Sequence, residues 1–210
     1  MGDVILKSIT LSSLEERYLE LSSSLVHTPT VKLTSPFLID LIKASQIYLK
    51  LECFQYSGTF KARGALSVAK QIPEKDKKFG ITAASAGNHA IAAAWAAKVE
   101  NLSAKVVMQT SANPFRISLA KTYGAEIIMK EGGVATFAEA DKLVREEKRT
   151  FIHPFDGVDT TLGAAGVGLE LIKDCTELDA VVVAVGGGGL MSGVAAAVKL
   201  KNSKCKVYGV

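Results

Sequence analysis

Three short segments of this sequence carry the residues that could do chemistry, and the first is SGTFKARGA, from Ser57 to Ala65. It places Lys61 in the first turn of an expected helix, beside Phe60 and with Ser57 or Thr59 as the capping residue. A lysine amine can bond covalently to a carbonyl compound, and the small residues around Lys61 leave room for one. Because most lysines are solvated surface groups, this interpretation depends on the other two segments.

The second segment is TAASAGNHA, in which Ser85, Ala86, Gly87 and Asn88 stand just before an expected helix. The free N–H groups in the first turn of that helix would favour an anion such as a carboxylate or a phosphate. An ordinary helix cap by Ser85 or Asn88 explains the same residues. His89, taken alone, is typical of a hydrogen-bonded structural histidine rather than of a ligand or a base.

The third segment is VGGGGLMSG, which contains the consecutive glycines Gly186, Gly187, Gly188 and Gly189 followed by Leu190. Glycines let backbone N–H groups crowd around a phosphate, and the dipole of a following helix adds to the attraction. The spacing differs from the dinucleotide pattern GxGxxG and from a P-loop. A tight turn is the alternative, but the run of glycines exceeds what a turn needs, which favours phosphate.

Strands and helices alternate along the chain, and each of the three segments follows an expected strand. We expect strands at 47–51, 81–84, 105–108, 125–129, 150–153, 181–185 and 206–210, the sixth of them buried on both faces, and helices between them. HTPTVKL is expected to be a loop, Gly132–Gly133 a turn, and GAAGVG (Gly163–Gly168) a site of close helix packing. The pattern predicts an α/β fold with parallel sheets covered by helices, and ligands in such folds bind beyond the carboxyl ends of the strands.

Composition excludes several other classes of protein. The chain has 210 residues, 22% of them charged, and a net charge of +4 from scattered lysines, which predicts no nucleic-acid partner. Three distant cysteines (Cys53, Cys175 and Cys205) suit reduced thiols in the cytoplasm, and the histidines lack the spacing of a metal site. The start does not resemble a signal peptide. The uncharged stretch 180–198 contains the glycine run, which predicts strand, loop and helix rather than a membrane span.

Together the three segments resemble the motifs of the fold-type-II pyridoxal phosphate enzymes, in the family of threonine and serine dehydratases and serine racemase. The resemblance runs from about His27 to the last residue. It implies pyridoxal 5'-phosphate as cofactor, with Lys61 holding it as a Schiff base and moving the α-proton of the substrate. Phe60 would pack against the cofactor ring and Asn88 would bond to its 3-hydroxyl group. The phosphate would lie in the loop formed by Gly186, Gly187, Gly188, Gly189 and Leu190.

The resemblance also implies a small amino acid as substrate, with its carboxylate bound by the loop of Ser85, Ala86, Gly87, Asn88 and His89. The reaction implied is β-elimination from L-threonine or L-serine, which yields a 2-oxo acid and ammonia. Racemases of this family have a second serine where this chain has Ala86, which argues against racemisation because alanine cannot donate a proton. The segment GAAG and Ile91 also depart from the family pattern. The alternatives are a serine racemase-like enzyme, a β-replacement enzyme, and a non-catalytic truncated homologue that binds cofactor or a partner chain.

The architecture implied by the resemblance has two lobes. Residues 80–153 would form a small lobe inserted into a large lobe built from residues 1–79 and 154–210, with the cofactor between the lobes. Family members continue beyond the last residue here, so we expect the C-terminal part of the large lobe to be absent. That absence would expose the apolar faces of strands near Val181 and Val207. A dimer or tetramer of identical chains is expected as well.

Overall fold

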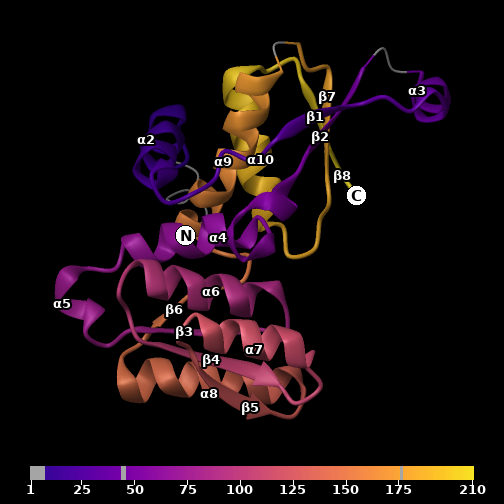
Figure 1. Ribbon diagram of the computed structural model, residues 1–210. Helices are drawn as coiled ribbons and strands as arrows, with labels where there is room; N and C mark the ends of the chain where they lie inside the picture. The colour runs from indigo at the N-terminus through magenta and orange to yellow at the C-terminus, as the bar shows by residue number, and fades with distance from the viewer. Residues whose placement is uncertain (1–7, 44–45, 176) are drawn as a thin grey trace.

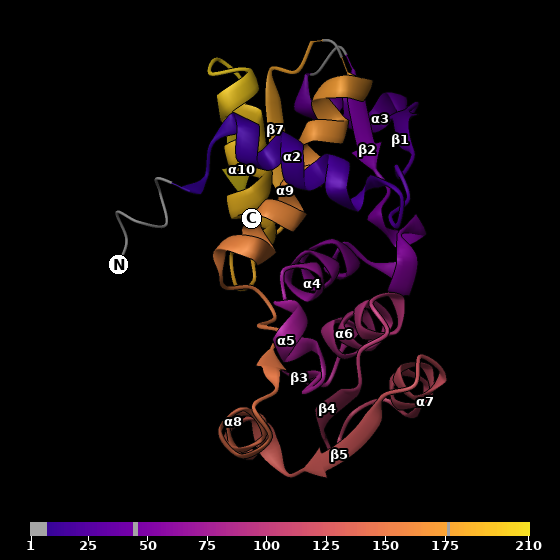
Figure 2. The same cartoon turned by 90° about the vertical axis from the view of Figure 1, so that its left-hand side faces the viewer.

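The computed structural model describes residues 8–43, 46–175 and 177–210. Its main sheet has four parallel strands in the order β5-β4-β3-β6. The strands are β3 (Ile81–Ala84), β4 (Ala104–Gln109), β5 (Glu126–Lys130) and β6 (Thr150–Phe151). Parallel neighbours need a crossover connection, and three helices supply it: α6 (Asn88–Val99), α7 (Pro114–Thr122) and α8 (Gly132–Glu147). Helices α6 and α7 cover one face of the sheet and α8 the other (Figure 2).

A second, smaller sheet lies in the other half of the molecule (Figure 1). It consists of the parallel pair β7 (Ala180–Val183) and β8 (Lys206–Gly209), joined by α10 (Gly189–Lys201). Three more helices complete this half: α2 (Leu11–Ser22), α4 (Lys61–Lys70) and α9 (Val158–Asp174). Helix α9 contacts α2, α4 and α10, which places it at the centre of the helical layer.

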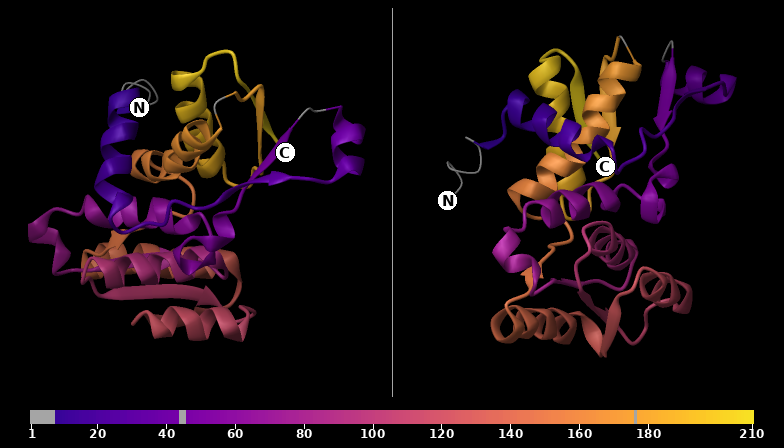
Figure 3. Two further views of the ribbon diagram at one scale, coloured as in Figure 1. Left: turned by 45° about the horizontal axis from the view of Figure 1, so that its top comes forward. Right: turned by 60° about the vertical axis from the view of Figure 1, so that its left-hand side comes forward.

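An antiparallel ribbon extends from this second half. Its strands are β1 (Thr30–Leu33) and β2 (Ile47–Lys50), paired from Thr30 with Lys50 to Leu33 with Ile47. Helix α3 (Pro36–Ile42) lies at the far end of the ribbon, away from the body of the molecule (Figures 1 and 3). The 3₁₀ turns η1 (Glu52–Phe54) and η2 (Tyr56–Gly58) lead from β2 to α4, and the short helix α5 (Glu74–Lys77) leads from α4 to β3. Among the described residues, no helix has the length and hydropathy that a membrane crossing requires.

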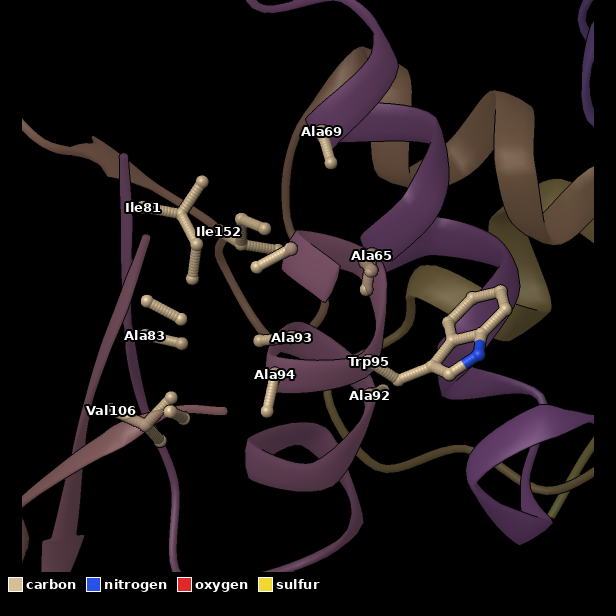
Figure 4. Close-up of a cluster of buried hydrophobic side chains, with 14 of the residues drawn as sticks. Ala65, Ala69, Ile81, Ala83, Ala92, Ala93, Ala94, Trp95, Val106 and Ile152 are labelled. Atoms are coloured by element: carbon tan, nitrogen blue, oxygen red, sulfur yellow. The ribbon is translucent and has the colours of Figure 1, made fainter. Parts of the chain in front are cut away.

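Small residues bring the elements of the main core close together. Helix α6 is buried along its whole length from His89 to Ala97, so it is apolar all round, as expected for an interior helix. Trp95 is its largest side chain, and the ring of Trp95 stacks on that of Tyr56 with 5.1 Å between centroids. Figure 4 shows how alanines of α4 and α6 face the aliphatic side chains of β3 and β4, namely Ala65, Ala69, Ala92, Ala93, Ala94, Ile81 and Val106.

Glycines allow α9 to touch both of its neighbouring helices. A Cβ atom on Gly163 would lie 2.5 Å from the carbonyl oxygen of Arg63 in α4, and one on Gly168 would lie 2.8 Å from the Cβ of Ala197 in α10. Real Cβ atoms do not come so close, so only glycine fits these positions. The expectation that Gly163–Gly168 serves close helix packing is therefore confirmed.

A network of buried charges joins the helical layer to the segments before it. The guanidinium of Arg63 has no exposed surface and lies 2.8 Å from an oxygen of Glu52 and 2.8 Å from an oxygen of Glu170. The amine of Lys50 lies 2.7 Å from Glu170 and 3.2 Å from Asp174. Burial alone would lower the pKa of Arg63, but the two carboxylates raise it, so the charge is fixed. Three segments that are distant in sequence thus meet at one cation.

Four secondary-structure predictions were wrong. HTPTVKL was expected to be a loop, but Thr30–Leu33 is strand β1, because β2 provides an antiparallel partner. Gly132–Gly133 opens helix α8 instead of forming a separate turn, although Gly132 itself has a positive φ of 72°. The strand predicted at 150–153 ends at Phe151.

The fourth error concerns β7, which was expected to be buried on both faces. Val181 and Val183 are buried, but the side chain of Val182 between them is 65% exposed, because only one face of β7 carries a helix. On the neighbouring strand Tyr208 is 50% exposed. An apolar face of this small sheet therefore lies open at Val182 and Tyr208, whereas Val181 is buried and Val207 is partly buried.

The buried charge network yields the first prediction. Replacing Arg63 by Met should lower the free energy of unfolding by about 3–5 kcal/mol, because Glu52 and Glu170 would lose the cation that pairs with them inside the protein. Chemical denaturation with urea measures this difference. The matched control is Arg145→Met on the exposed surface of α8, where the change should be within about 0.5 kcal/mol. Equal stabilities of the two variants would contradict the structural role of Arg63.

Candidate active site

Four helices begin at one small cavity. It is lined by Phe60 and Lys61 at the start of α4, His89 at the start of α6, Thr160 in the first turn of α9, and Gly189 with Leu190 at the start of α10. The first turn of a helix has N–H groups without a helical partner and carries a partial positive charge. Four such helix ends around one cavity therefore make it a place where an anion is favoured.

Among the residues that the structure describes, Lys61 is the only lysine that lines this cavity, and it is half-buried. Its amine donates a hydrogen bond to the carbonyl oxygen of Pro154, and it lies 5.1 Å from the centroid of the Phe60 ring. Among the described residues, no carboxylate lies within ion-pair distance of Lys61. Burial lowers the pKa of the amine. A larger fraction of Lys61 is therefore unprotonated at neutral pH than of a solvated lysine, and the unprotonated amine is the form that attacks a carbonyl carbon.

The helix that presents Lys61 starts with a hydrogen bond from its own backbone. The N–H group of Lys61 donates to the side-chain oxygen of Thr59 over 3.3 Å. The sequence analysis predicted Ser57 or Thr59 as the capping residue, and Thr59 makes this contact. Ser57 instead adopts a left-handed backbone conformation with φ of 61° in the turn before the helix.

The loop before α6 leaves the start of that helix without a side-chain cap. Gly87 is the residue at the N-cap position, and no side chain there accepts from the helix. The hydroxyl of Ser85 accepts a hydrogen bond from the N–H of Gly87 at 3.1 Å, within the loop itself. Capping by Ser85 or Asn88, the alternative explanation of these residues, is therefore absent at this helix start. Ala86 packs against the main core.

His89 is held inside the protein as a neutral side chain. It is 4% exposed, and its Nε2 atom lies 2.8 Å from the carbonyl oxygen of Ile152, to which it donates. Burial lowers the pKa of His89 to about 4, and the hydrogen bond to Ile152 only partly opposes that effect. The imidazole is thus uncharged at neutral pH and helps to hold α6 against the end of β6.

The glycine loop before α10 combines close packing with an open side. A Cβ atom on Gly187 would lie 2.0 Å from the ring of Phe155, and one on Gly189 would lie 2.5 Å from the carbonyl oxygen of Phe155. Cβ atoms on Gly186 and Gly188 would meet nothing within 4 Å. Gly188 has a positive φ of 90°, which L-residues with a side chain rarely adopt. One side of the loop is therefore fixed against Phe155 and the other is free to receive a ligand.

The predicted site residues divide between two cavities. Phe60, Lys61, His89, Gly189 and Leu190 line the small one beside Lys61. Asn88 lines a second, wider cavity of about 720 Å³ together with Ser57, Thr59 and Arg116. The other predicted residues line neither of the two described cavities: Ser85, Ala86, Gly87, Gly186, Gly187 and Gly188.

Sequence reasoning missed a fourth loop, the segment HPFDG at 153–157, which follows β6. Pro154 accepts the hydrogen bond of Lys61, and the ring of Phe155 lies against the glycine loop. The Nδ1 atom of His153 accepts from the N–H groups of Phe155 at 3.3 Å and of Asp156 at 2.9 Å, which fixes the turn. The signal was present in the sequence, because this segment follows a parallel strand, as the segments after β3 and β7 do.

Burial lowers the pKa of His153; the nearby carboxylate of Asp156 opposes this effect, and the charge of Lys61 adds to it. His153 also stacks edge-on against Phe155, with 4.6 Å between ring centroids. Both histidines near Lys61 therefore favour their neutral forms. The charge that an incoming anion meets at this cavity comes from Lys61 and the helix ends.

Comparison with known proteins supplies a family for this arrangement. The family model described as pyridoxal-phosphate dependent enzyme matches residues 23–210. The phenylserine dehydratase of Ralstonia pickettii is 45% identical over 169 residues, covering 80% of this chain and 52% of that protein. The L-threonine ammonia-lyase of Thermotoga maritima is 37% identical over 204 residues, covering 96% of this chain and 50% of that protein.

Among solved structures, maize serine racemase superimposes with a TM-score of 0.89 at 30% identity, covering 95% of this chain and 60% of that one. The chain thus spans about half the length of the two curated relatives named above.

The buried neutral state of His89 yields the second prediction. Well above pH 6.5 this histidine is neutral in both the folded and the unfolded chain. As the pH falls from 6.5 toward 4, the unfolded chain takes up a proton that the folded protein does not, so stability is lost. His89→Gln keeps an N–H donor and should lack this component, which amounts to roughly 2–3 kcal/mol of the unfolding free energy.

Denaturation curves at pH 7, 5.5 and 4 measure this loss. The matched control is His27→Gln, which removes a histidine whose side chain is 39% exposed and should retain the loss. An unfolding free energy of His89→Gln that falls as steeply as in the unmodified protein would show that another group is responsible.

Proposed function

We propose a function from the premise that this chain belongs to the family of pyridoxal-phosphate dependent enzymes. The proposed reaction is elimination from a 3-hydroxy amino acid, L-threonine or L-serine in the first place, which produces a 2-oxo acid and ammonia. The observation that carries the proposal is Lys61, a half-buried amine with a lowered pKa at a cavity where four helices begin. The names of the relatives support the substrate class, since they include a threonine ammonia-lyase and a phenylserine dehydratase.

The residues present fit the cofactor. An aldehyde needs an unprotonated amine, which the lowered pKa of Lys61 favours. A phosphate needs converging N–H groups, which the glycine loop and the start of α10 offer on the open side of Gly186 and Gly188. The cavity beside Lys61 measures only about 10 Å³, room for about one water molecule. Binding of a pyridine ring there therefore requires residues that line the cavity to move.

The proposed roles of the chain's residues follow from these positions. When bound, pyridoxal phosphate supplies an electron sink for the substrate's α-carbon. Lys61 takes the α-proton at its Nζ atom and returns protons from the same face. The uncapped start of α6, with Ser85, Gly87 and His89, binds the substrate carboxylate by its N–H groups. Asn88 is assigned to the 3-hydroxyl group of the cofactor.

The remaining assignments concern the cofactor's surroundings. Phe60 packs against the ring, and the phosphate is bound by Gly186, Gly187, Gly188, Gly189 and Leu190.

The division into lobes is a further part of the proposal. The four-stranded sheet is built only from strands between Ile81 and Phe151, and Lys61 and the glycine loop lie on either side of that stretch in sequence. We assign residues 80–153 to an inserted lobe, with residues 1–79 and 154–210 forming the other. We also assign the protein to the cytoplasm and expect a homo-oligomer. Whether this chain alone turns over substrate is decided by the test that follows.

The third prediction tests the role of Lys61. With pyridoxal phosphate added, the protein should convert L-threonine or L-serine to the 2-oxo acid, which is measured with a hydrazine reagent. Phenylserine is tested as a third substrate in the same assay. Borohydride reduction should fix the cofactor to Nζ of Lys61, located by peptide mass spectrometry. Lys61→Ala should lose both the label and at least a thousandfold in rate, a magnitude expected for a group that transfers the proton.

The matched control is Lys70→Ala, which removes a lysine from the last turn of the same helix and should keep the label and the rate. A label on any other lysine would refute the assignment. A label on Lys61 with no formation of 2-oxo acid would support the cofactor site and favour the non-catalytic alternative.

The fourth prediction concerns Ala86. Elimination needs proton transfer on the face of the substrate served by Lys61, whereas inversion of the α-carbon needs a second acid on the opposite face. The unmodified protein should therefore form little D-amino acid from L-serine. Ala86→Ser should raise racemisation relative to elimination, by severalfold rather than by orders of magnitude, because a new hydroxyl also needs alignment. Chiral chromatography measures both products.

Ala86→Gly is the control, since it changes the same side chain without adding a hydroxyl and should leave the ratio unchanged. Rapid racemisation by the unmodified protein would mean that another residue supplies the second acid.

A further inference from the structure

We propose that the hydroxyl group of Thr160 donates a hydrogen bond to the phosphate group of the cofactor. This inference rests on the proposed function, because it concerns a ligand held beside Lys61. Thr160 lies in the first turn of α9 and lines the same cavity as Lys61, Gly189 and Leu190.

The starting observation is a buried hydroxyl with no partner. Thr160 is 7% exposed, and its Oγ1 atom has neither solvent contact nor a hydrogen bond. Leaving such a group unpaired costs about 1–3 kcal/mol. The described part of the chain contains two other buried side-chain oxygens of this kind, on Ser57 and Thr82, and neither residue lines the cavity beside Lys61.

The orientation of Thr160 separates its methyl group from its hydroxyl. The methyl carbon faces Gly64 of α4, 3.1 Å from the place where a Cβ would lie, so it fills the contact between α4 and α9. The hydroxyl lies on the other side, 3.9 Å from the place of a Cβ on Gly157. A threonine in a helix commonly donates to the carbonyl four residues earlier, but Thr160 makes no such bond. Packing therefore explains the methyl group and leaves the hydroxyl without a role.

The surroundings of the hydroxyl favour an anion as its partner. Helices α9 and α10 both start at this cavity, so their N-terminal dipoles favour negative charge there. A phosphate has oxygens that accept hydrogen bonds, and the glycine loop that would hold it provides Gly189 to the same cavity. The substrate carboxylate is assigned to the start of α6 instead. Thr160 thus adds a side-chain donor to a site otherwise made of backbone N–H groups.

The experiment compares Thr160→Val with two matched variants. Valine has nearly the shape of threonine and keeps the methyl group that faces Gly64, so Thr160→Val should fold. Thr160→Ser retains the hydroxyl and removes the methyl group. Thr82→Val removes an equally buried and unpaired hydroxyl from β3, away from the cavity. Unfolding curves without cofactor should show both valine variants to be at least as stable as the unmodified protein, because each loses an unsatisfied polar group.

Spectroscopic titrations with pyridoxal phosphate and with pyridoxal then give the affinities. Thr160→Val should bind pyridoxal phosphate about tenfold more weakly, the loss expected for one hydrogen bond to a charged group. Its affinity for pyridoxal, which has no phosphate, should be unchanged. Thr82→Val should match the unmodified protein with both compounds, and Thr160→Ser should keep most of the affinity for pyridoxal phosphate. Unchanged affinity of Thr160→Val for pyridoxal phosphate, or equal losses for both compounds, would overturn the inference.

Inorganic phosphate alone provides an independent measurement. It should raise the thermal unfolding midpoint of the unmodified protein and of Thr82→Val by more than that of Thr160→Val, because ligands that bind the folded state stabilise it. If the unmodified protein does not bind pyridoxal phosphate, the proposed function fails, and this phosphate measurement alone decides the role of Thr160. Equal phosphate responses of the two valine variants would overturn that role.

Discussion

The charge of Arg63 is the constraint on which the rest of this structure depends. A guanidinium without exposed surface can exist only with anionic partners, and Glu52 and Glu170 provide them from η1 and α9. Glu170 in turn pairs with Lys50 of β2. The start of α4 is therefore tied to three other segments. Because Lys61 stands two residues before Arg63 on the same helix, this network also determines where the reactive amine lies.

Close packing around α9, together with the buried charges, determines how α4, α9 and α10 are positioned. Gly163 lets α9 touch α4 near Arg63, and Gly168 lets it touch α10. The three helices then lie near enough for their first turns to reach one cavity, which α6 joins from the main sheet. A larger residue at either glycine would move α9 outward and separate Thr160 from Lys61. The site thus depends on small residues as much as on the polar side chains that line it.

Much of this arrangement could be predicted from sequence, because local pattern and loop position determine it. The strand at Ile81–Ala84 has the predicted bounds, and Lys61 lies in the first turn of its helix. Features decided by distant partners could not be predicted. Strand β1 exists because β2 pairs with it, and Val182 is exposed because a helix covers only one face of its sheet. The hydroxyl of Thr160 likewise is unpaired because α9 packs against α4 and buries it, which the sequence pattern does not show.

The loop at 153–157 shows a different limit. Its position after a parallel strand was available from sequence, but His153 and Asp156 are the only ionisable residues in it and they match no known motif spacing. Its importance comes from the backbone: the carbonyl of Pro154 accepts from Lys61, and the ring of Phe155 occupies the space beside Gly187. Every residue has a backbone carbonyl, so the sequence does not indicate which carbonyl will accept a functional hydrogen bond.

Two cations on the first turn of one helix behave in opposite ways, and their partners explain why. Arg63 has two carboxylates, which raise its pKa against the effect of burial and fix its charge. Lys61 is half-buried, has only a neutral carbonyl oxygen as partner, and has a lowered pKa. A carboxylate beside Lys61 would favour the protonated amine and oppose covalent capture of an aldehyde. Because Glu52 and Glu170 pair with Arg63, α4 can serve as a rigid support while Lys61 remains able to react.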